Sequence, residues 1–417
     1  MEIRPIKKFS KRLKCKSDKS VTHRAVMFNA AFGESATVTD PLISADCLST
    51  VECMRALGAE IEVGNTVRIV RGGITKTDAL LDCGNSGTTM RLMTGLMSGI
   101  TGTFRLIGDD SLSRRPMKRV TEPLSAMGAR VVSTDGHAPL EVTGGKLHAI
   151  DYTMPVKSAQ VKSAILLAAL GAEGTTIVRE STKSRDHTER MLARMGADLR
   201  VDGSTVYLTG GRKLHGIDVN VCGDISSAAY AMSLAAGTDG GTAVIDNVGI
   251  NPTRTGILDV LKEMGAGVSL DNIRRGVEDT ATVTVTGRVH RAVTVGGDII
   301  PRLIDELPVI AVLMALCEGE SVIKDAAELK VKETDRIATT VSALKNLGVE
   351  VEATPDGMRI FGRGAIAGGG TVDSCGDHRI AMAMSVAMAL SHRGGTLLGE
   401  ECCAVSYPDF FSVHFSE

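Results

Sequence analysis

Residues 83–97 of the chain read Cys83-Gly84-Asn85-Ser86-Gly87-Thr88-Thr89-Met90-Arg91-Leu92-Met93-Thr94-Gly95-Leu96-Met97. Small and polar residues come first, and an apolar run with Arg91 as its only charge follows, which predicts a tight turn leading into a buried helix. The first N–H groups of such a helix lack carbonyl partners, and Gly87 has no side chain to keep an anionic ligand away from them. A single copy of this pattern is also typical of an ordinary helix cap.

The sequence contains this pattern of polar turn, apolar helix and glycine-led strand six times. The glycines before the strands are Gly33, Gly102, Gly174, Gly241, Gly319 and Gly395, at steps of 69, 72, 67, 78 and 76 residues. A repeat of such even length indicates a repeated architecture. Between the copies lie amphipathic helices that end at a glycine, as at Gly58 and Gly128, and are followed by two alternating strands.

These patterns predict an α/β protein with two domains, each built from three βαβαββ-type repeats around three buried helices. The apolar helices carry almost no charge after their first turn, so they should be enclosed on all sides. The last repeat lacks its outer half, and the N-terminal strand Met1–Arg4 could complete it. We therefore expect an N-terminal domain of residues 14–223 and a C-terminal domain of residues 1–13 and 224–417.

The composition excludes several classes of function. The 417 residues carry a formal net charge of only -2, and aromatic residues make up 3% with no Trp, which argues against nucleic-acid binding. The apolar runs are shorter than the ~20 residues that span a bilayer, and the basic N-terminal region lacks the apolar core of a signal peptide. The nine cysteines include no Cys-x-x-Cys pair. We expect a cytoplasmic protein with reduced thiols, no metal, no nucleic acid and no membrane partner.

Cations stand at several predicted helix N-termini, where the helix dipole disfavours them. They are Lys19, Arg24, Arg91 and Arg379. Two loop segments add further basic residues, Arg114–Arg119 and Lys332–Arg336. A solvated basic surface is the simplest interpretation of the two loops, but the helix cations require a negative ligand or carboxylate to offset their cost.

Six motifs in this order resemble those of the 5-enolpyruvylshikimate-3-phosphate synthase family. They are Asp18-Lys19-Ser20-x-x-His23-Arg24, Gly84-Asn85-Ser86-Gly87-Thr88-x-x-Arg91, Asp110-x-Leu112-x-x-Arg115-Pro116-Met117, Ser158-x-Gln160, Lys332-Glu333-Thr334-Asp335-Arg336 and Asp377-His378-Arg379. The resemblance extends over nearly the whole chain. It implies two inside-out α/β domains with the active site in the cleft between them.

The resemblance also implies a reaction. The carboxyvinyl group of phosphoenolpyruvate would be transferred to the 5-hydroxyl of shikimate 3-phosphate, with release of phosphate, on the route to chorismate and aromatic amino acids. Both substrates are small anions, no cofactor is implied, and glyphosate should compete with phosphoenolpyruvate. We expect the protein to be a monomer.

The site residues follow from the matching motif positions. The residues implied to bind shikimate 3-phosphate are Lys19, Ser20, Arg24, Ser158, Gln160, Ser184, Asp305 and Lys332. Those implied to bind phosphoenolpyruvate are Lys19, Asn85, Gly87, Arg115, Gln160, Arg336 and Arg379. The implied catalytic residues are Asp305 as proton acceptor, Glu333 as proton donor to the methylene carbon, and Lys19.

The chemistry suits two carboxyl groups in different electrostatic surroundings, one acting as base and the other as acid. Asp305 near Lys19 would stay ionised, and an anionic ligand next to Glu333 would keep that group protonated. The sequence departs from the family pattern at Lys16-Ser17, where Pro-Gly is usual, and at Val405, where some members have lysine.

Two alternatives remain open. The sister family transfers the same group to UDP-N-acetylglucosamine and often carries a reactive cysteine or aspartate in the loop that here contains Asp109 and Asp110. A non-catalytic repeat scaffold that binds an anionic metabolite would explain the repeats, but not Asp305 and Glu333.

Overall fold

A computed structural model describes residues 1–415 of the chain. It divides into two compact units: unit 1 consists of Met1–Lys16 and the chain from Cys222 onward, and unit 2 is Ser17–Val221. The expected boundaries, after residues 13 and 223, differ from these by a few residues. Strand pairing explains the shift, because β2 (Ser10–Lys14) pairs with β17 (Thr242–Gly249) and Gly223 bridges to Val248, all within unit 1.

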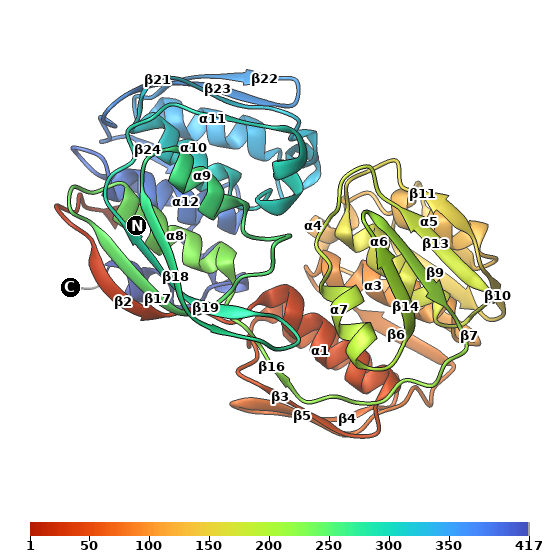
Figure 1. Ribbon diagram of the computed structural model, residues 1–417. Coiled ribbons are helices and arrows are strands. Elements are labelled where there is room, and N and C mark those ends of the chain that lie inside the picture. Colours follow the sequence, from red (N-terminus) through yellow and green to blue (C-terminus); the bar gives the residue numbers. More distant parts are fainter. Residues whose placement is uncertain (416–417) are drawn as a thin grey trace. The chain divides into compact units, whose positions relative to one another are not determined.

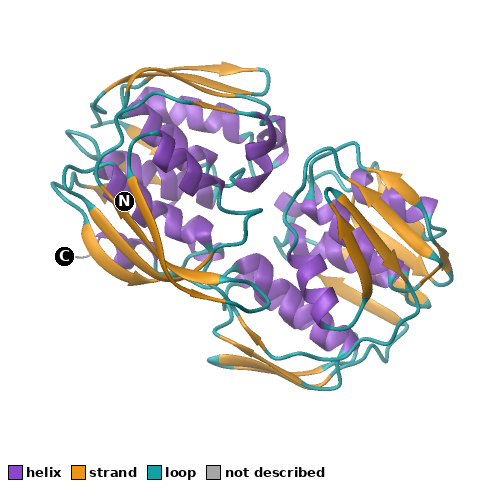
Figure 2. Ribbon diagram, viewed as in Figure 1, coloured by secondary structure: helices purple, strands orange, loops and turns teal. Residues whose placement is uncertain are grey.

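Unit 2 has helices inside and strands outside (Figures 1 and 2). Its inner helices are α1 (Lys19–Phe32), α3 (Gly87–Ser98) and α6 (Ala159–Ala169). Its other helices are α2 (Ala45–Ala56), α4 (Asp110–Ser113), α5 (Lys118–Ala126) and α7 (His187–Arg194). Helix α5 begins at Lys118, and the short helix α4 precedes it because Asp109 accepts a hydrogen bond from the N–H of Leu112.

The strands of unit 2 form three sheets of the same design. Their strands are β3 (Ala36–Thr39), β4 (Glu60–Val63), β5 (Thr66–Arg71), β6 (Asp78–Asp82), β7 (Gly102–Ile107), β8 (Arg130–Thr134), β9 (His137–Gly144), β11 (Asp151–Thr153), β13 (Thr175–Arg179), β14 (Asp198–Asp202), β15 (Thr205–Thr209) and β16 (Val219–Asn220). The orders are β16-β3-β5-β4, β6-β7-β9-β8 and β11-β13-β15-β14, and in each only the first pair is parallel. A short parallel pair, β10 (Leu147–His148) and β12 (Ala172–Glu173), lies beside them.

Unit 1 repeats this design. Its inner helices are α8 (Ile225–Ala236), α10 (Leu307–Ala315) and α12 (His378–Ala389). Its other helical segments are α9 (Gly256–Glu263), α11 (Arg336–Asn346), α13 (Phe410–Phe415) and the 3-10 turns η1 (Gly297–Arg302), η2 (Ala327–Val331) and η3 (Glu400–Val405). The remaining strands are β1 (Glu2–Ile3), β18 (Gly267–Arg274), β19 (Thr280–Thr286), β20 (Thr294–Val295), β21 (Glu318–Ile323), β22 (Glu350–Thr354), β23 (Gly357–Arg363), β24 (Thr371–Asp373) and β25 (Gly395–Leu398).

The sheet orders in unit 1 are β2-β17-β19-β18, β20-β21-β23-β22 and β24-β25-β1. The sixth repeat supplies only β24 and β25 to the last sheet. Strand β1 pairs antiparallel with β25, where a hairpin strand stands in the other repeats. The N-terminal strand thus joins the sheet of the sixth repeat, as predicted, but this sheet has three strands where those of the other repeats have four. The βαβαββ-type repeat is confirmed.

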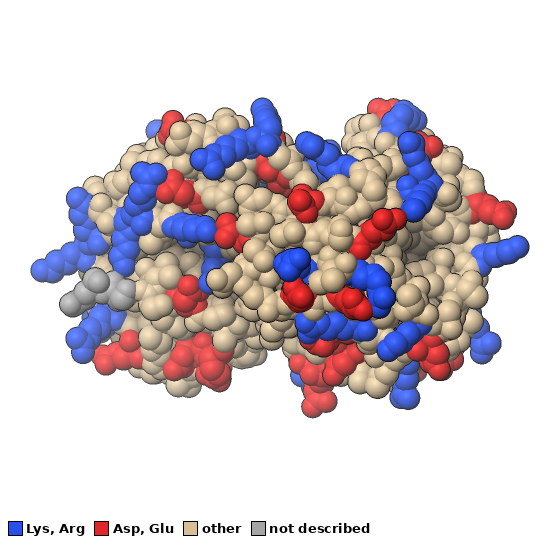
Figure 3. All heavy atoms as spheres, turned by 90° about the horizontal axis from the view of Figure 1, so that it is seen from below, with Lys and Arg blue, Asp and Glu red and all other residues tan. Residues whose placement is uncertain are grey.

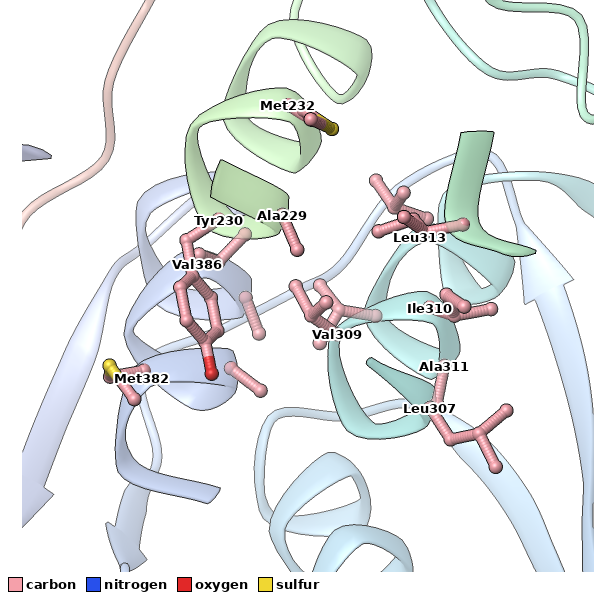
Figure 4. Close-up of a cluster of buried hydrophobic side chains, with 14 of the residues drawn as sticks. Ala229, Tyr230, Met232, Leu307, Val309, Ile310, Ala311, Leu313, Met382 and Val386 are labelled. Atoms are coloured by element: carbon pink, nitrogen blue, oxygen red, sulfur yellow. The ribbon is translucent and has the colours of Figure 1, made fainter. Parts of the chain in front are cut away.

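The inner helices are enclosed as their composition predicts. Every residue of α8, α10 and α12 is buried. Figure 4 shows where these helices meet, with Tyr230 of α8, Val309 of α10 and Val386 of α12 among the packed side chains. In unit 2, Gly95 of α3 allows α6 to approach closely, because a Cβ at that position would lie 2.2 Å from the carbonyl oxygen of Ala164.

The surface matches the near-neutral composition. On the face seen in Figure 3, basic and acidic side chains are interspersed. Within residues 1–415, no helix is both long and apolar enough to cross a membrane.

Two buried histidines make stability depend on pH. Burial lowers the pKa of His23 to about 3 and that of His414 to about 4, from 6.5. As the pH falls below 6.5, the unfolded chain therefore binds protons that the folded chain does not.

We expect full stability above pH 6.5 and a progressive loss as the pH falls towards about 5, before most carboxylates titrate. Thermal unfolding followed by circular dichroism across this range measures the loss. The variant His414→Phe should make the melting temperature less dependent on pH, whereas His148→Gln, at an exposed position, should not change this dependence. A melting temperature that stays constant in wild type would contradict the prediction.

Candidate active site

The turn before α3 is held from both sides. The Asn85 side chain donates from Nδ2 to Asp109 at 2.8 Å and accepts from Nη2 of Arg115 at 2.9 Å. Ser86 caps the helix by accepting the N–H of Thr89 at 3.1 Å. The turn that the sequence predicts is thus present, and the Asn85 amide is fixed between the carboxylate of Asp109 and the guanidinium of Arg115.

Two guanidinium groups lie against Gly87, the first residue of α3. A Cβ there would be 2.9 Å from Nη1 of Arg91 and 3.3 Å from Nη1 of Arg115. As the first two residues of the helix, Gly87 and Thr88 have N–H groups without a carbonyl partner in their own helix. Backbone donors and cations therefore converge on one point, an arrangement that binds phosphate or carboxylate.

Arg91 braces this turn from within the unit. It is buried and donates from Nη1 to Oε1 of Gln160 at 2.6 Å, and Gln160 in turn donates to Oγ1 of Thr88 at 3.0 Å. Gln160 of α6 is thereby brought to the start of α3.

The basic stretch after β7 is only partly a solvated surface. Arg115 turns inward towards Asn85, whereas Arg114 and Lys118 are exposed. The sequence alone could not separate these residues, because they are adjacent and of the same type.

At the start of α1, cations are offset by groups of the protein. The Nζ of Lys19 lies 2.9 Å from Asp46 of α2. Arg24 is buried and donates to Thr188 at 2.7 Å, to Ser163 at 2.9 Å and to the carbonyl of Ser20 at 3.0 Å. The predicted need for a compensating partner is thus met by a carboxylate for Lys19 and by oxygen acceptors for Arg24.

Ser158 and Ser184 are positioned differently. Ser158 stands at the N-cap of α6 but makes no capping bond with its side chain. Ser184 is buried, and its Oγ has no hydrogen-bond partner among residues 1–415. A buried hydroxyl without a partner is costly, so a ligand acceptor at this point would be stabilising.

A buried lysine holds the segment that carries Ser184. Lys162 of α6, 0% exposed, lies 2.7 Å from both Glu180 and Glu189 and donates to the carbonyl of Ser184 at 3.4 Å. Burial alone would lower the pKa of Lys162, but Glu189 and Glu180 outweigh it and raise that pKa. Sequence reasoning missed the two glutamates; a lysine within an otherwise apolar helix was the available signal.

In unit 1, a charged cluster surrounds the buried guanidinium of Arg336. It donates to Asp377 at 2.8 Å, to Asp305 at 3.2 Å and to Glu333 at 2.5 Å. Burial alone would lower the pKa of Arg336, but the carboxylates of Asp377, Glu333 and Asp305 raise it. The two predicted catalytic carboxyl groups therefore share one cation.

Lys332 and Arg379 complete this end of unit 1. The Nζ of Lys332 lies 3.9 Å from Oδ1 of Asp305, so Asp305 has Lys332 beside it as well as Arg336. Arg379 donates to the hydroxyl of Tyr230 at 3.4 Å. Burial alone would lower the pKa of Arg379, whereas the neighbouring Tyr230 and carboxylates raise it well above its usual value.

A second buried cluster lies at the start of α8, and sequence reasoning did not include its cation. Arg254 donates to Asp224 at 3.0 Å and to Ser226 at 2.6 Å, and the Ser226 hydroxyl donates to Glu306. Asp224, Ser226 and Glu306 were recognisable as polar helix starts. Arg254 follows a strand in a loop, where one arginine gives no signal of burial.

A family model for EPSP synthase (3-phosphoshikimate 1-carboxyvinyltransferase) matches residues 3–413. The chain belongs to this family. The 3-phosphoshikimate 1-carboxyvinyltransferase of Bacillus velezensis is 50% identical over 401 residues, covering 94% of each chain. That of Bacillus subtilis is 48% identical over 404 residues, again 94% of each.

Solved structures show the same architecture. The EPSP synthase of Acinetobacter baumannii superimposes with a TM-score of 0.87 at 41% identity, covering 99% of this chain and 96% of that one. The enolpyruvyl transferase NikO of Streptomyces tendae, at 18% identity and a TM-score of 0.76, shares the fold. The fold expected from the repeats is therefore that of the EPSP synthase family.

Proposed function

We propose that the chain transfers the enolpyruvyl group of phosphoenolpyruvate to the 5-hydroxyl of shikimate 3-phosphate. The products are 5-enolpyruvylshikimate 3-phosphate and phosphate, and the reaction serves chorismate and aromatic amino acid biosynthesis. The observation that carries the proposal is the placement of Asp305 and Glu333 on one guanidinium, that of Arg336, at 3.2 and 2.5 Å. Membership in the EPSP synthase family supports the choice of substrates.

The substrates are proposed to be held by the cations and helix starts of both units. In unit 2, Lys19, Asn85, Gly87, Arg115 and Gln160 would bind phosphoenolpyruvate, and Lys19, Ser20, Arg24, Ser158, Gln160 and Ser184 would bind shikimate 3-phosphate. In unit 1, Arg336 and Arg379 would bind the donor, and Asp305 and Lys332 the acceptor. Planar guanidinium groups and helix N–H groups both suit phosphate and carboxylate oxygens.

The proposed chemistry is addition followed by elimination. Asp305 accepts the proton of the 5-hydroxyl as its oxygen attacks C2 of phosphoenolpyruvate, and Glu333 donates a proton to C3. In the tetrahedral intermediate, C3 then loses a proton while the C2–O bond to phosphate breaks, so that the double bond re-forms. These steps require no cofactor.

Arg336 suggests how the two carboxyl groups differ. A cation at 2.5 Å stabilises the ionised form of Glu333, but an anionic donor that bound the same guanidinium would weaken this ion pair. The ligand charge beside Glu333 would then favour its protonated form. Asp305 would keep Lys332 as a second cation, so it would remain ionised and able to act as the base.

We also propose that the enzyme acts as a monomer in the cytoplasm. The sequence has nine cysteines, an odd number without a Cys-x-x-Cys pair, which fits a reducing compartment.

The proposed acceptor is tested by phosphate release from phosphoenolpyruvate with either shikimate 3-phosphate or UDP-N-acetylglucosamine. We expect turnover only with shikimate 3-phosphate. Turnover only with the UDP-sugar would assign the chain's activity to the sister reaction, and no turnover with either would favour the binding scaffold.

Asp305→Ala should lower kcat by about 10²- to 10⁴-fold, because the attacking hydroxyl loses its base. Binding of shikimate 3-phosphate, measured by calorimetry, should be retained. Asp305→Asn is the matched control for side-chain size and should show the same loss of kcat. Near-normal turnover in either variant would remove Asp305 from the mechanism.

Gly87→Ala should raise KM for phosphoenolpyruvate by about tenfold, because its Cβ would meet Arg91 at 2.9 Å and Arg115 at 3.3 Å. Glyphosate should compete with phosphoenolpyruvate in wild type and inhibit this variant more weakly. Gly145→Ala is the control, since nothing lies within 4 Å of a Cβ at that position. An unchanged KM in Gly87→Ala, or glyphosate inhibition that is independent of donor concentration, would contradict the assignment of this turn.

A further inference from the structure

A continuous chain of buried hydrogen bonds connects α1 to the turn before α3. Nδ1 of His23 lies 2.7 Å from Oγ1 of Thr50 on α2, and Thr50 lies 2.7 Å from Oγ1 of Thr89 on α3. Thr89 donates to Oγ of Ser86 at 2.7 Å. All four side chains belong to residues that are 0% exposed. The proposed binding residues do not include any of the four.

The donors and acceptors of this series of hydrogen bonds can be arranged in only one direction. A threonine hydroxyl has a single proton, and that of Thr89 goes to Ser86, so Thr50 has to donate to Thr89. The proton of Thr50 is then used, and Nδ1 of His23 has to be the donor to Thr50. His23 is therefore the tautomer with its proton on Nδ1. Its other nitrogen, Nε2, is buried and has no hydrogen-bond partner among residues 1–415.

The two ends of the hydrogen-bond series, His23 and Ser86, lie beside two groups of proposed binding residues. Ser86 is the N-cap of α3 and stands between Asn85 and Gly87, so its orientation sets the direction of the N–H groups that follow. His23 lies one turn after Lys19 on α1. Thr50 belongs to α2, as does Asp46, the partner of Lys19.

We propose that His23 is a positioning residue for the turn before α3, the proposed phosphoenolpyruvate site, and that it acts through Thr50, Thr89 and Ser86. By donating from Nδ1 it fixes the direction of the whole chain, and Ser86 is held so that the N–H groups of Gly87 and Thr88 face the ligand. This inference rests on the proposed function, because it takes phosphoenolpyruvate as the ligand of the turn.

The charge state of His23 suits this role. Burial is the largest cause that lowers its pKa to about 3; Asp46 opposes the shift, and Lys19 and Arg24 reinforce it. The ring is therefore neutral near neutral pH, with one donor and one acceptor nitrogen. A histidine that only filled space in the core would not need a donor nitrogen directed at Thr50.

The test compares variants that keep or remove the donor. In His23→Asn, the side-chain amide nitrogen takes nearly the place of Nδ1, whereas His23→Leu has no donor. We expect His23→Leu to raise the KM of phosphoenolpyruvate, measured at saturating shikimate 3-phosphate, by about tenfold. His23→Asn should restore most of the affinity, and the Kd of shikimate 3-phosphate alone should not change in either variant.

Thr50→Val tests the hydrogen-bond series at a position outside α1, since it removes the hydroxyl that connects His23 to Thr89 while His23 stays in place. It should reproduce the effect of His23→Leu, and the double variant should be no worse than either single one. Thr94→Val is the control, because Thr94 is equally buried on α3 but donates only to the carbonyl of Met90 in its own helix. Additive losses, equal losses for both substrates, or no rescue by His23→Asn would overturn the inference.

A measurement without substrate separates this inference from the proposed function. Hydrogen exchange of the unliganded protein should be faster at the N–H groups of Thr89 and Met90, which are hydrogen-bonded to Ser86, in His23→Leu and Thr50→Val than in wild type, His23→Asn or Thr94→Val. Unchanged exchange there would overturn the inference even in an active enzyme. If wild type does not act on shikimate 3-phosphate, the proposed function fails, and the exchange pattern still decides whether His23 holds the turn.

Discussion

A helix that is apolar on every side has to be surrounded by protein, and its backbone leaves hydrogen-bonding groups unsatisfied only at its ends. Each unit of this protein encloses three such helices within strands and outer helices. The predicted binding residues on the inner helices accordingly lie near the N-termini, where backbone N–H groups are unsatisfied. The four-stranded sheets repeat because each repeat performs the same task of covering one inner helix.

Placing cations near helix N-termini opposes the helix dipole, and the structure offsets this cost with carboxylates and hydroxyls. Asp46 faces Lys19, Thr188 and Ser163 bind Arg24, and Asp377 binds Arg336. Such ion pairs keep the cations ordered and partly desolvated. An anionic substrate can then be bound by exchanging one negative partner for another, which disturbs the protein less than creating a buried charge would.

Residue types in a repeated pattern were enough to predict the inner helices, the strand that completes the last repeat and the polar helix starts. Adjacent residues of one type could not be separated in this way, as Arg114 and Arg115 show, because their exposure depends on how the short helix α4 turns the chain. The glutamates that bind Lys162 were also missed. They are 18 and 27 positions away in the chain and meet the lysine only in the folded unit.

The sequence by itself determined the fold class, the number of repeats and the family, since these depend on hydrophobic period, turn residues and motif order, which are local properties. Only the tertiary structure decided which polar groups share a proton or a charge. Asp305 reaches Arg336, and His23 reaches Thr89 through Thr50, because segments that are separate in the chain bring their side chains within 2.7 to 3.2 Å. Distances of this kind arise from packing between segments far apart in the chain, so no local pattern encodes them.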